Sequence, residues 1–239
     1  MNTTVTQTIG EIVAKDFRAA SVFSKYKIDF CCKGDRTIEE VCEKKSINVD
    51  ELNEKLQEAM TDQNENIDYN SWPLDLLADY VEKTHHRYIR EKSPSLFQFL
   101  NKVQKVHGER HPELYEIFNL FSQSVEDLEN HLQKEERILF PFIRKMVEAK
   151  NSGQPLEPAH FGSVENPIEM MKDDHSVEGE RFRKIAELTQ GYTPPQEACN
   201  TYKVSFAMLD EFEQNLHKHI HLENNILFPK AIKMEESMK

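Results

Sequence analysis

Glycine is scarce in this chain, with 7 among 239 residues. A β-rich or dinucleotide-binding fold needs many tight turns, so this scarcity argues against both. The sequence also lacks an apolar run near the ~20 residues that span a bilayer. Its first residues, MNTTVTQTIGEIVAKD, lack the basic start and apolar stretch of a signal peptide. We therefore expect a cytoplasmic protein without a membrane segment.

Basic residues are outnumbered, with 30 Lys and Arg against 42 Asp and Glu, for a net charge of −12. This balance gives no general attraction to nucleic acid or to anionic lipid, so neither is an expected partner. The four cysteines, at 31, 32, 42 and 199, match neither a disulfide framework nor a zinc motif. In a reducing compartment we expect them to be thiols.

The first part of the chain predicts a small helical module over residues 1–58. Apolar residues recur at helical spacing between Ile9 and Tyr26, and Gly34 follows in a turn that can end this helical stretch. Thr37 followed by Glu40 is a capping-box pattern, and Asn48 followed by Glu51 suggests the start of another helix. Residues 59–71 are polar and have little to bury, so they predict a linker.

The rest of the chain, residues 72–239, predicts a four-helix bundle. Four long amphipathic segments follow one another without a strand signal, and turns rich in proline and glycine separate the second from the third and the third from the fourth. Their approximate ranges are 73–107, 112–150, 166–190 and 197 to the carboxyl end. The fold class is therefore all-α.

The second and fourth of these helices share the motif H-x-x-x-E-x-x-I-L-F-P. HLQKEERILFP runs from His131, and HIHLENNILFP runs from His219, at an offset of 88 residues. The first and third helices extend the repeat, because His175 lies 89 residues after His86. Each half of the domain therefore offers one histidine, and then a His-x-x-x-Glu motif that ends at Glu135 or Glu223.

Residues four apart on a helix lie on one face, so His-x-x-x-Glu directs an imidazole and a carboxylate to the same side. Together, the two halves supply four imidazoles and two carboxylates toward the bundle interior. Packing alone explains the repeated ILFP but requires neither the His nor the Glu, and burying them unpaired would cost several kcal/mol. A nitrogen and oxygen set of this kind suits iron or manganese, and zinc is a further alternative.

The spacing leaves one position open in the first helix. Either His85 or His86 can point inward, because adjacent helical residues are about 100° apart. In the last helix His217 and His221 form another face, but the repeat selects His219 because Glu223 must match Glu135. The other histidines, at 107, 111 and 160, look like surface or loop residues.

Three further residues accompany the repeat. Asp127 lies one turn before His131 and either lines the pocket or is a solvated helix residue. Pro141 and Pro229 lie inside otherwise helical patterns, where each removes a backbone hydrogen bond. We expect these prolines to kink or end the helices.

With these motifs the chain resembles the iron–sulfur cluster repair di-iron (RIC) family, whose main domain is hemerythrin-like. The resemblance covers essentially the whole chain through YKIDFCCKG, KTHHRYIREKSP, HLQKEERILFP, DDHSVEGE, TPPQEAC and HIHLENNILFP. It implies a hemerythrin-like four-helix bundle with two non-haem irons joined by an oxo or hydroxo bridge. The family register relative to Pro94 selects His86 over His85. The implied iron ligands are His86, His131, Glu135, His175, His219 and Glu223, with the two glutamates bridging.

The amino-terminal module departs from the family pattern at one residue. The family has Cys-Cys-Gly-Gly, whereas this chain has Cys31-Cys32-Lys33-Gly34. Lys33 either favours the thiolate form of its neighbours or is a solvated loop residue, and we prefer the second reading. We expect Cys31 and Cys32 to accept iron or electrons near the di-iron site or a client cluster.

The resemblance implies a stress-response protein that restores iron–sulfur clusters damaged by nitric oxide or peroxide, by supplying iron. Damaged iron–sulfur proteins would be its clients, and the family expectation is a homodimer. One alternative is a hemerythrin-like protein that binds or senses oxygen or nitric oxide. Another is a di-iron enzyme that reduces nitric oxide or peroxide, so the sequence leaves open whether the protein is an enzyme.

Overall fold

Helices make up most of the computed structural model, which describes residues 7–61 and 67–238. Within these ranges the only β-structure is two isolated bridges, which confirms the all-α class. The chain divides into two compact units, residues 1–77 with 220–239 and residues 78–219. In the described ranges, no helix combines the length and apolar character that crossing a bilayer requires.

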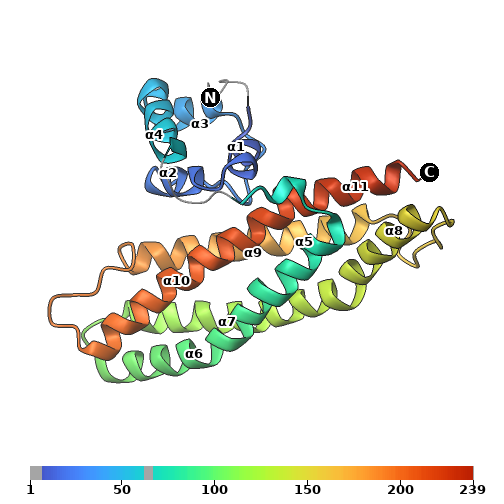
Figure 1. The fold of residues 1–239 in the computed structure, drawn as a ribbon. Coiled ribbons are helices and arrows are strands. Elements are labelled where there is room, and N and C mark those ends of the chain that lie inside the picture. Colours follow the sequence, from blue (N-terminus) through green and yellow to red (C-terminus); the bar gives the residue numbers. More distant parts are fainter. Residues whose placement is uncertain (1–6, 62–66, 239) are drawn as a thin grey trace. The chain divides into compact units, whose positions relative to one another are not determined.

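The first unit combines the amino-terminal helices with the carboxyl end of the chain (Figure 1). Its helical segments are α1 (Ile9–Lys15), α2 (Ala19–Lys25), α3 (Ile38–Lys45), α4 (Val49–Thr61), η1 (Tyr69–Ser71), η4 (Glu223–Leu227) and α11 (Phe228–Glu236). Of the predicted linker, residues 59–61 belong to α4 and residues 62–66 lie outside the described part. The end of the linker forms the short 3-10 helix η1.

Side-chain caps explain where these short helices begin. Thr37 and Glu40 form the predicted capping box at α3, each side chain bonding the other's backbone N–H. Asn48 caps α4, because its Oδ1 accepts hydrogen bonds from the backbone N–H groups of Asp50 and Glu51. The helical starts predicted at these residues are thus present.

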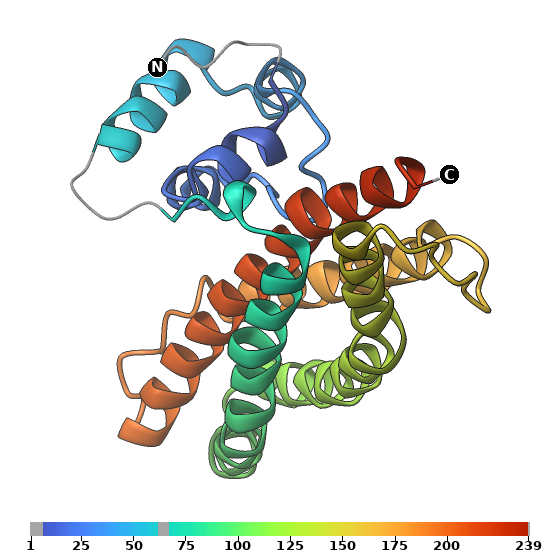
Figure 2. The same cartoon turned by 45° about the vertical axis from the view of Figure 1, so that its right-hand side comes forward.

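The second unit is built on four long helices that run alongside one another (Figures 1 and 2). They are α6 (Arg87–His107), α7 (Glu113–Lys134), α9 (Glu165–Leu188) and α10 (Asn200–Leu222). Two shorter helices extend this series along the chain. The boundary between the units falls within α5 (Leu74–Tyr80), which precedes η2 (Val81–His86) and α6, and α8 (Phe140–Ser152) follows α7 and η3 (Glu135–Leu139). A phenylalanine in α10 joins all four long helices. The ring of Phe212 lies 5.4 Å from Phe121, 5.6 Å from Phe182 and 6.1 Å from Tyr88, measured between centroids.

Three π-helical segments interrupt the long helices. They are η2 (Val81–His86), η3 (Glu135–Leu139) and η4. Pro141 and Pro229 are the second residues of α8 and α11, the helices that follow η3 and η4. These prolines end neither helix. The local change is a wider π-helical turn, because proline lacks the N–H that would bond the carbonyl four residues earlier.

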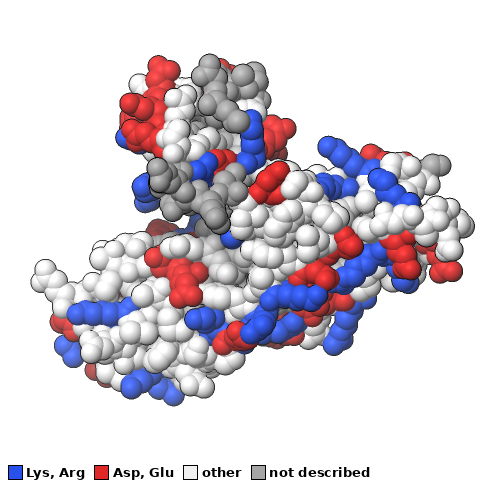
Figure 3. Space-filling model, in the orientation of Figure 1, with Lys and Arg blue, Asp and Glu red and all other residues white. Residues whose placement is uncertain are grey.

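Acidic and basic side chains are interspersed on the face of the bundle drawn in Figure 3. Several of them form ion pairs between helices. One is the Arg144 guanidinium of α8, which contacts Asp79 at 2.7 Å and Glu82 at 2.6 Å. Such pairs fix the helices laterally but contribute little stability each, since both partners are partly solvated.

Candidate metal centre

The π-helical segments position the candidate ligands. His86 is the last residue of η2, Glu135 is the first of η3 and Glu223 is the first of η4. A π-turn displaces the residues beside it from ordinary helical register, and such turns occur frequently at functional sites. The three π-helical segments therefore lie at residues that the repeat, or the family register for His86, predicts as metal ligands.

The structure brings all six predicted residues together in two overlapping groups. Within each group the ligand atoms lie within 4.8 Å of one another. The first group contains His86 and His219, the second contains His131 and His175, and both contain Glu135 and Glu223. All six side chains are buried, with at most 2% of their surface exposed. The two carboxylates are thus common to two histidine pairs, and each group has the kind of donors that can hold a metal ion in the core of a bundle.

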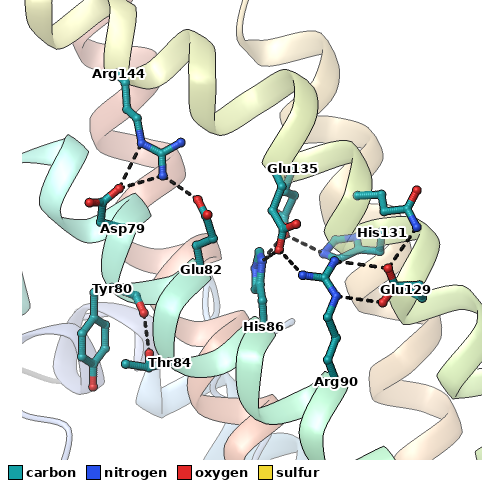
Figure 4. A network of polar contacts seen from close by, with 12 residues as sticks. Asp79, Tyr80, Glu82, Thr84, His86, Arg90, Glu129, His131, Glu135 and Arg144 are labelled. Carbon is teal, nitrogen blue, oxygen red and sulfur yellow. Dashed lines mark hydrogen bonds and ion pairs between the residues drawn. The ribbon is translucent and has the colours of Figure 1, made fainter.

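The imidazole nitrogens converge on Glu135. Its Oε2 lies 3.3 Å from His86 Nε2 and 3.3 Å from His131 Nε2, as Figure 4 shows for these three residues. His175 Nε2 lies 3.1 Å from His131 Nε2. Nitrogen and oxygen donors collected in a buried space are costly unless a cation compensates them. The donor set therefore fits a metal of the iron or manganese type.

A carboxylate orients His86 from behind. His86 Nδ1 lies 2.9 Å from Glu136 Oε1, and the Arg90 guanidinium contacts the same oxygen at 2.7 Å. Arg90 also binds Glu129, which extends the network in Figure 4. The hydrogen bond from His86, followed by that from Arg90, lowers the pKa of Glu136 to about 2. An ionised carboxylate on Nδ1 leaves Nε2 for the metal, which is the usual support of a metal-binding histidine.

A second carboxylate orients His131 in the same way. His131 Nδ1 lies 3.2 Å from Asp174 Oδ2, and Lys134 Nζ binds this oxygen at 3.1 Å. The hydrogen bond from His131 lowers the pKa of Asp174 to about 2. The bond from Lys134 also lowers this pKa, whereas burial opposes the change. Glu136 and Asp174 were absent from the sequence prediction. The available signal was an acidic residue directly beside a predicted ligand in each case.

His85 is buried together with its neighbour but belongs to neither group of ligand atoms. Its Nδ1 lies 3.0 Å from Asn215 Oδ1, and its ring stacks on His219 at a centroid distance of 5.8 Å and an interplanar angle of 6°. Tyr80 meets the same ring edge-on at 5.7 Å. The geometry thus separates two adjacent histidines that spacing alone left open. His86 joins the donors, and His85 packs behind one of them.

Asp127, which the sequence predicts either to line the pocket or to be solvated, is largely exposed and pairs with Arg181 at 2.6 Å. It lines a pocket of about 650 Å³ that His131 also lines. Arg181 in turn contacts Glu178, a buried carboxylate that accepts a hydrogen bond from Ser124 Oγ at 2.5 Å. Asp127 therefore lies in the lining of the pocket, where its carboxylate accepts a hydrogen bond from Arg181.

The two predicted thiols lie in a tight turn of the first unit. The Sγ atoms of Cys31 and Cys32 are 3.7 Å apart, and Cys31 is buried. Asp29 Oδ1 accepts hydrogen bonds from the backbone N–H groups of Cys31 and Cys32 at 3.2 and 2.9 Å. The hydrogen bond with Cys32, together with burial, raises the pKa of Cys31 well above its usual value. A raised pKa opposes the thiolate form of Cys31, and Lys33 itself is exposed.

Residues of η4 and of the end of α10 hold this turn within the first unit. Asn224 Nδ2 donates to the Cys31 carbonyl at 3.1 Å, and Asn225 Nδ2 donates to the Phe30 carbonyl at 3.2 Å. His221 packs its buried ring against Phe30 at 5.9 Å. The fit is close, because a Cβ added at Gly34 would lie 2.6 Å from the Phe30 carbonyl oxygen. His221, one of the two histidines of the alternative helix face, thus packs beside the Cys-Cys turn.

Family models and named proteins match both parts of the chain. Residues 5–60 match the family model described as a domain of unknown function (DUF542), and residues 77–231 match the hemerythrin HHE cation binding domain. The iron–sulfur cluster repair protein YtfE of Yersinia pestis (strain Pestoides F) is 33% identical over 229 residues, which cover 96% of this chain and 98% of that protein. The protein of the same name from Pectobacterium carotovorum is 34% identical over 230 residues, with the same coverage. The chain therefore belongs to the family of iron–sulfur cluster repair proteins that carry a hemerythrin HHE cation-binding domain.

Proposed function

We propose that the chain binds two iron ions and uses them to restore damaged iron–sulfur clusters, acting in the cytoplasm on iron–sulfur proteins as clients. One ion would be held by His86 and His219 and the other by His131 and His175. Glu135 and Glu223 would bridge them. The observation that carries this proposal is the sharing of both glutamates between the two groups of donors.

The donor set supports transferable iron rather than a structural metal. Two nitrogens and two bridging oxygens leave each iron below six-coordination, so a small molecule or an accepting ligand can approach. Iron is then the cargo of the reaction as well as a bound ion. The names of the relatives support iron–sulfur cluster repair as the use of this cargo.

The Cys-Cys turn is the proposed acceptor of iron or electrons. Asn224, which holds the Cys31 carbonyl, directly follows Glu223 in the sequence. A change at the metal-binding glutamate can therefore reach the thiol turn through two adjacent residues. The raised pKa of Cys31 means that this thiol is protonated at neutral pH and must lose its proton before it binds iron.

Metal analysis of the purified chain with its visible spectrum tests the metal centre. We expect about two irons per chain, and we expect Glu135→Ala to remove both because Glu135 belongs to both groups of donors. Glu148→Ala, an exposed glutamate on the continuation of the same helix, is the matched control and should keep both irons. Zinc, or no bound metal in the unaltered chain, would refute the proposed centre.

Repair of a damaged cluster in vitro tests the role of the thiols. An iron–sulfur protein whose cluster has been damaged by peroxide would be incubated with the iron-loaded chain, and recovery of its cluster would be followed by absorbance. We expect Cys31→Ser with Cys32→Ser to lower the repair rate while the iron content stays unchanged. Cys42→Ser is the control for a buried thiol elsewhere in the module. Equal repair by the double variant and the unaltered chain would exclude the thiol role.

A further inference from the structure

The two halves of the bundle are related residue by residue, so their surroundings can be compared at matched positions. In the second and fourth helices the offset is 88 residues, which pairs His131 with His219. In the first and third it is 89, which pairs Val177 with Tyr88. If the two halves were equivalent, the two residues of each matched pair would have a similar exposure. Several matched pairs instead differ in exposure.

The side of the site at His131 is open. His131 forms part of the wall of the pocket of about 650 Å³, whose rim includes Arg137, Ile138 and Val177. Val177 is 55% exposed and Ile138 is 38% exposed. Asp174, the partner of His131 Nδ1, also lines the pocket, and its side chain is 37% exposed. Water and small chelating molecules can therefore reach the contact between Asp174 and the His131 ring.

The matched side at His219 is closed within the second unit. The position of Asp174 is taken by His85, which is 3% exposed and stacks on the His219 ring. The position of Val177 is taken by Tyr88, whose hydroxyl bonds Glu211 at 3.0 Å. His219 is thus backed by an aromatic ring where His131 is backed by a solvated carboxylate.

The matched positions further along the last helix are closed as well. Ile226, the counterpart of exposed Ile138, is 1% exposed. Leu222, the counterpart of Lys134, is fully buried. Asn225, the counterpart of Arg137, donates to the Phe30 carbonyl of the Cys-Cys turn. The residues that form an open rim in one half are covered in the other.

We propose that the two metal positions are kinetically unequal: the ion between His131 and His175 exchanges through the pocket, and the ion between His86 and His219 is retained. This inference rests on the proposed function, because it assumes that two ions are bound. A metal leaves when one of its ligands rotates away and is replaced by water or by a chelator. His131 can make this movement toward solvent, since its partner Asp174 is 37% exposed. In the other pair, His219 is stacked on His85, and Glu136, the partner of His86, is 21% exposed and bound by Arg90. Val177 lines the pocket and Tyr88 occupies the matched position on the other side, so we expect these two residues to set which ion leaves first.

Iron release to a ferrous chelator such as ferrozine, recorded by absorbance under reducing conditions, tests the inequality. We expect two phases, each of one iron per chain. Val177→Tyr, which installs the residue of the closed side, should slow the fast phase about tenfold and leave the slow phase unchanged, as an added barrier on one route does. Tyr88→Val, the reciprocal change, should accelerate the slow phase.

Met170→Tyr is the matched control, because Met170 is equally exposed on the same helix but does not line the pocket. It should alter neither phase, and unchanged helical circular dichroism would show that all three variants fold. Release of both irons in a single phase, or equal slowing of both phases by Val177→Tyr, would overturn the inference while leaving the proposed function intact. A chain that fails to bind two irons would instead refute the proposed function before any rate is measured.

Discussion

Residues 131–141 and 219–229 share one sequence motif, yet the residues between its fixed positions contact different neighbours. In the first copy Glu136 supports His86, and Arg137 lines an open pocket. In the second copy the matched residues are Asn224 and Asn225, which hold the Cys-Cys turn. The donor positions are the same because both halves must supply the same ligands. The other positions differ because the first copy lines a pocket, whereas the second copy contacts the Cys-Cys turn within the first unit.

The difference also divides two kinds of support. The first copy uses charge, with carboxylates on the imidazoles and cations on the carboxylates. The second copy uses packing and neutral amides, with His85 stacked on His219 and Asn225 bonded to a backbone carbonyl. Charged support tolerates water, whereas packed support requires that water be excluded. Three variants test this comparison, in order of decreasing expected effect on the metal centre.

The largest effect is expected when the charged support is removed. Glu136→Ala deletes the acceptor for His86 Nδ1, so the ring loses its orientation and metal affinity should fall about 10–100-fold. Competition with a chelator of known affinity measures this change. Glu129→Ala is the control, because Glu129 binds the same Arg90 without touching His86. Equal losses in both variants would mean that the ion-pair network, and not the support of His86, sets the affinity.

A smaller effect is expected when the amide support is removed. Asn225→Ala deletes the hydrogen bond to the Phe30 carbonyl and should destabilise the first unit by about 1 kcal/mol. It should also expose the Cys31 thiol, which can be followed by its rate of reaction with a thiol reagent. Arg137→Ala, at the matched position of the first copy, should leave this rate unchanged. Faster reaction in both variants would remove the proposed division of roles.

The smallest effect on the metal centre is expected for a carboxyl group found only in the second half. Burial raises the pKa of Glu213 to about 7, whereas an unfolded glutamate titrates near ~4.3. Between these values the folded chain binds more protons than the unfolded chain, so this group makes stability fall as pH rises. The matched residue in the first half is Val125, which does not titrate.

Glu213→Gln should therefore reduce the difference in melting temperature between pH 5 and pH 8, chiefly by raising the value at pH 8. Thermal unfolding followed by circular dichroism measures both values. Glu148→Gln, on an exposed surface, should leave the difference as it is in the unaltered chain. A larger difference in Glu213→Gln would show that the ionised carboxylate is stabilised in the folded chain, contrary to the effect of its burial.

Much of the fold follows from local sequence signals. The capping residues Thr37 and Asn48 mark helix starts that the structure contains. The long helices lie where periodicity and turn residues predict them. The behaviour of Pro141 and Pro229 was not predictable in the same way, because a π-helical turn accommodates a proline without a break and has no simple sequence signal.

The candidate site divides along the same line. The repeat alone named five of the six residues whose donor atoms the structure brings together, and the family register added His86. The supporting residues Glu136 and Asp174 escaped notice, since a charged residue beside a ligand is common on helix surfaces. His85 and His221 show the same limit, because spacing assigns a face to a residue but not the neighbour that it meets.

By itself the sequence determined the all-α class, the internal repeat and the set of inward donors. These depend on helical periodicity and on fixed offsets, which are properties of the chain alone. Only the tertiary structure decided which imidazoles a carboxylate orients, which half opens to a pocket and which half holds the Cys-Cys turn. Those features depend on contacts between residues far apart in the chain, and burial and charge at such contacts appear only when the helices are packed together.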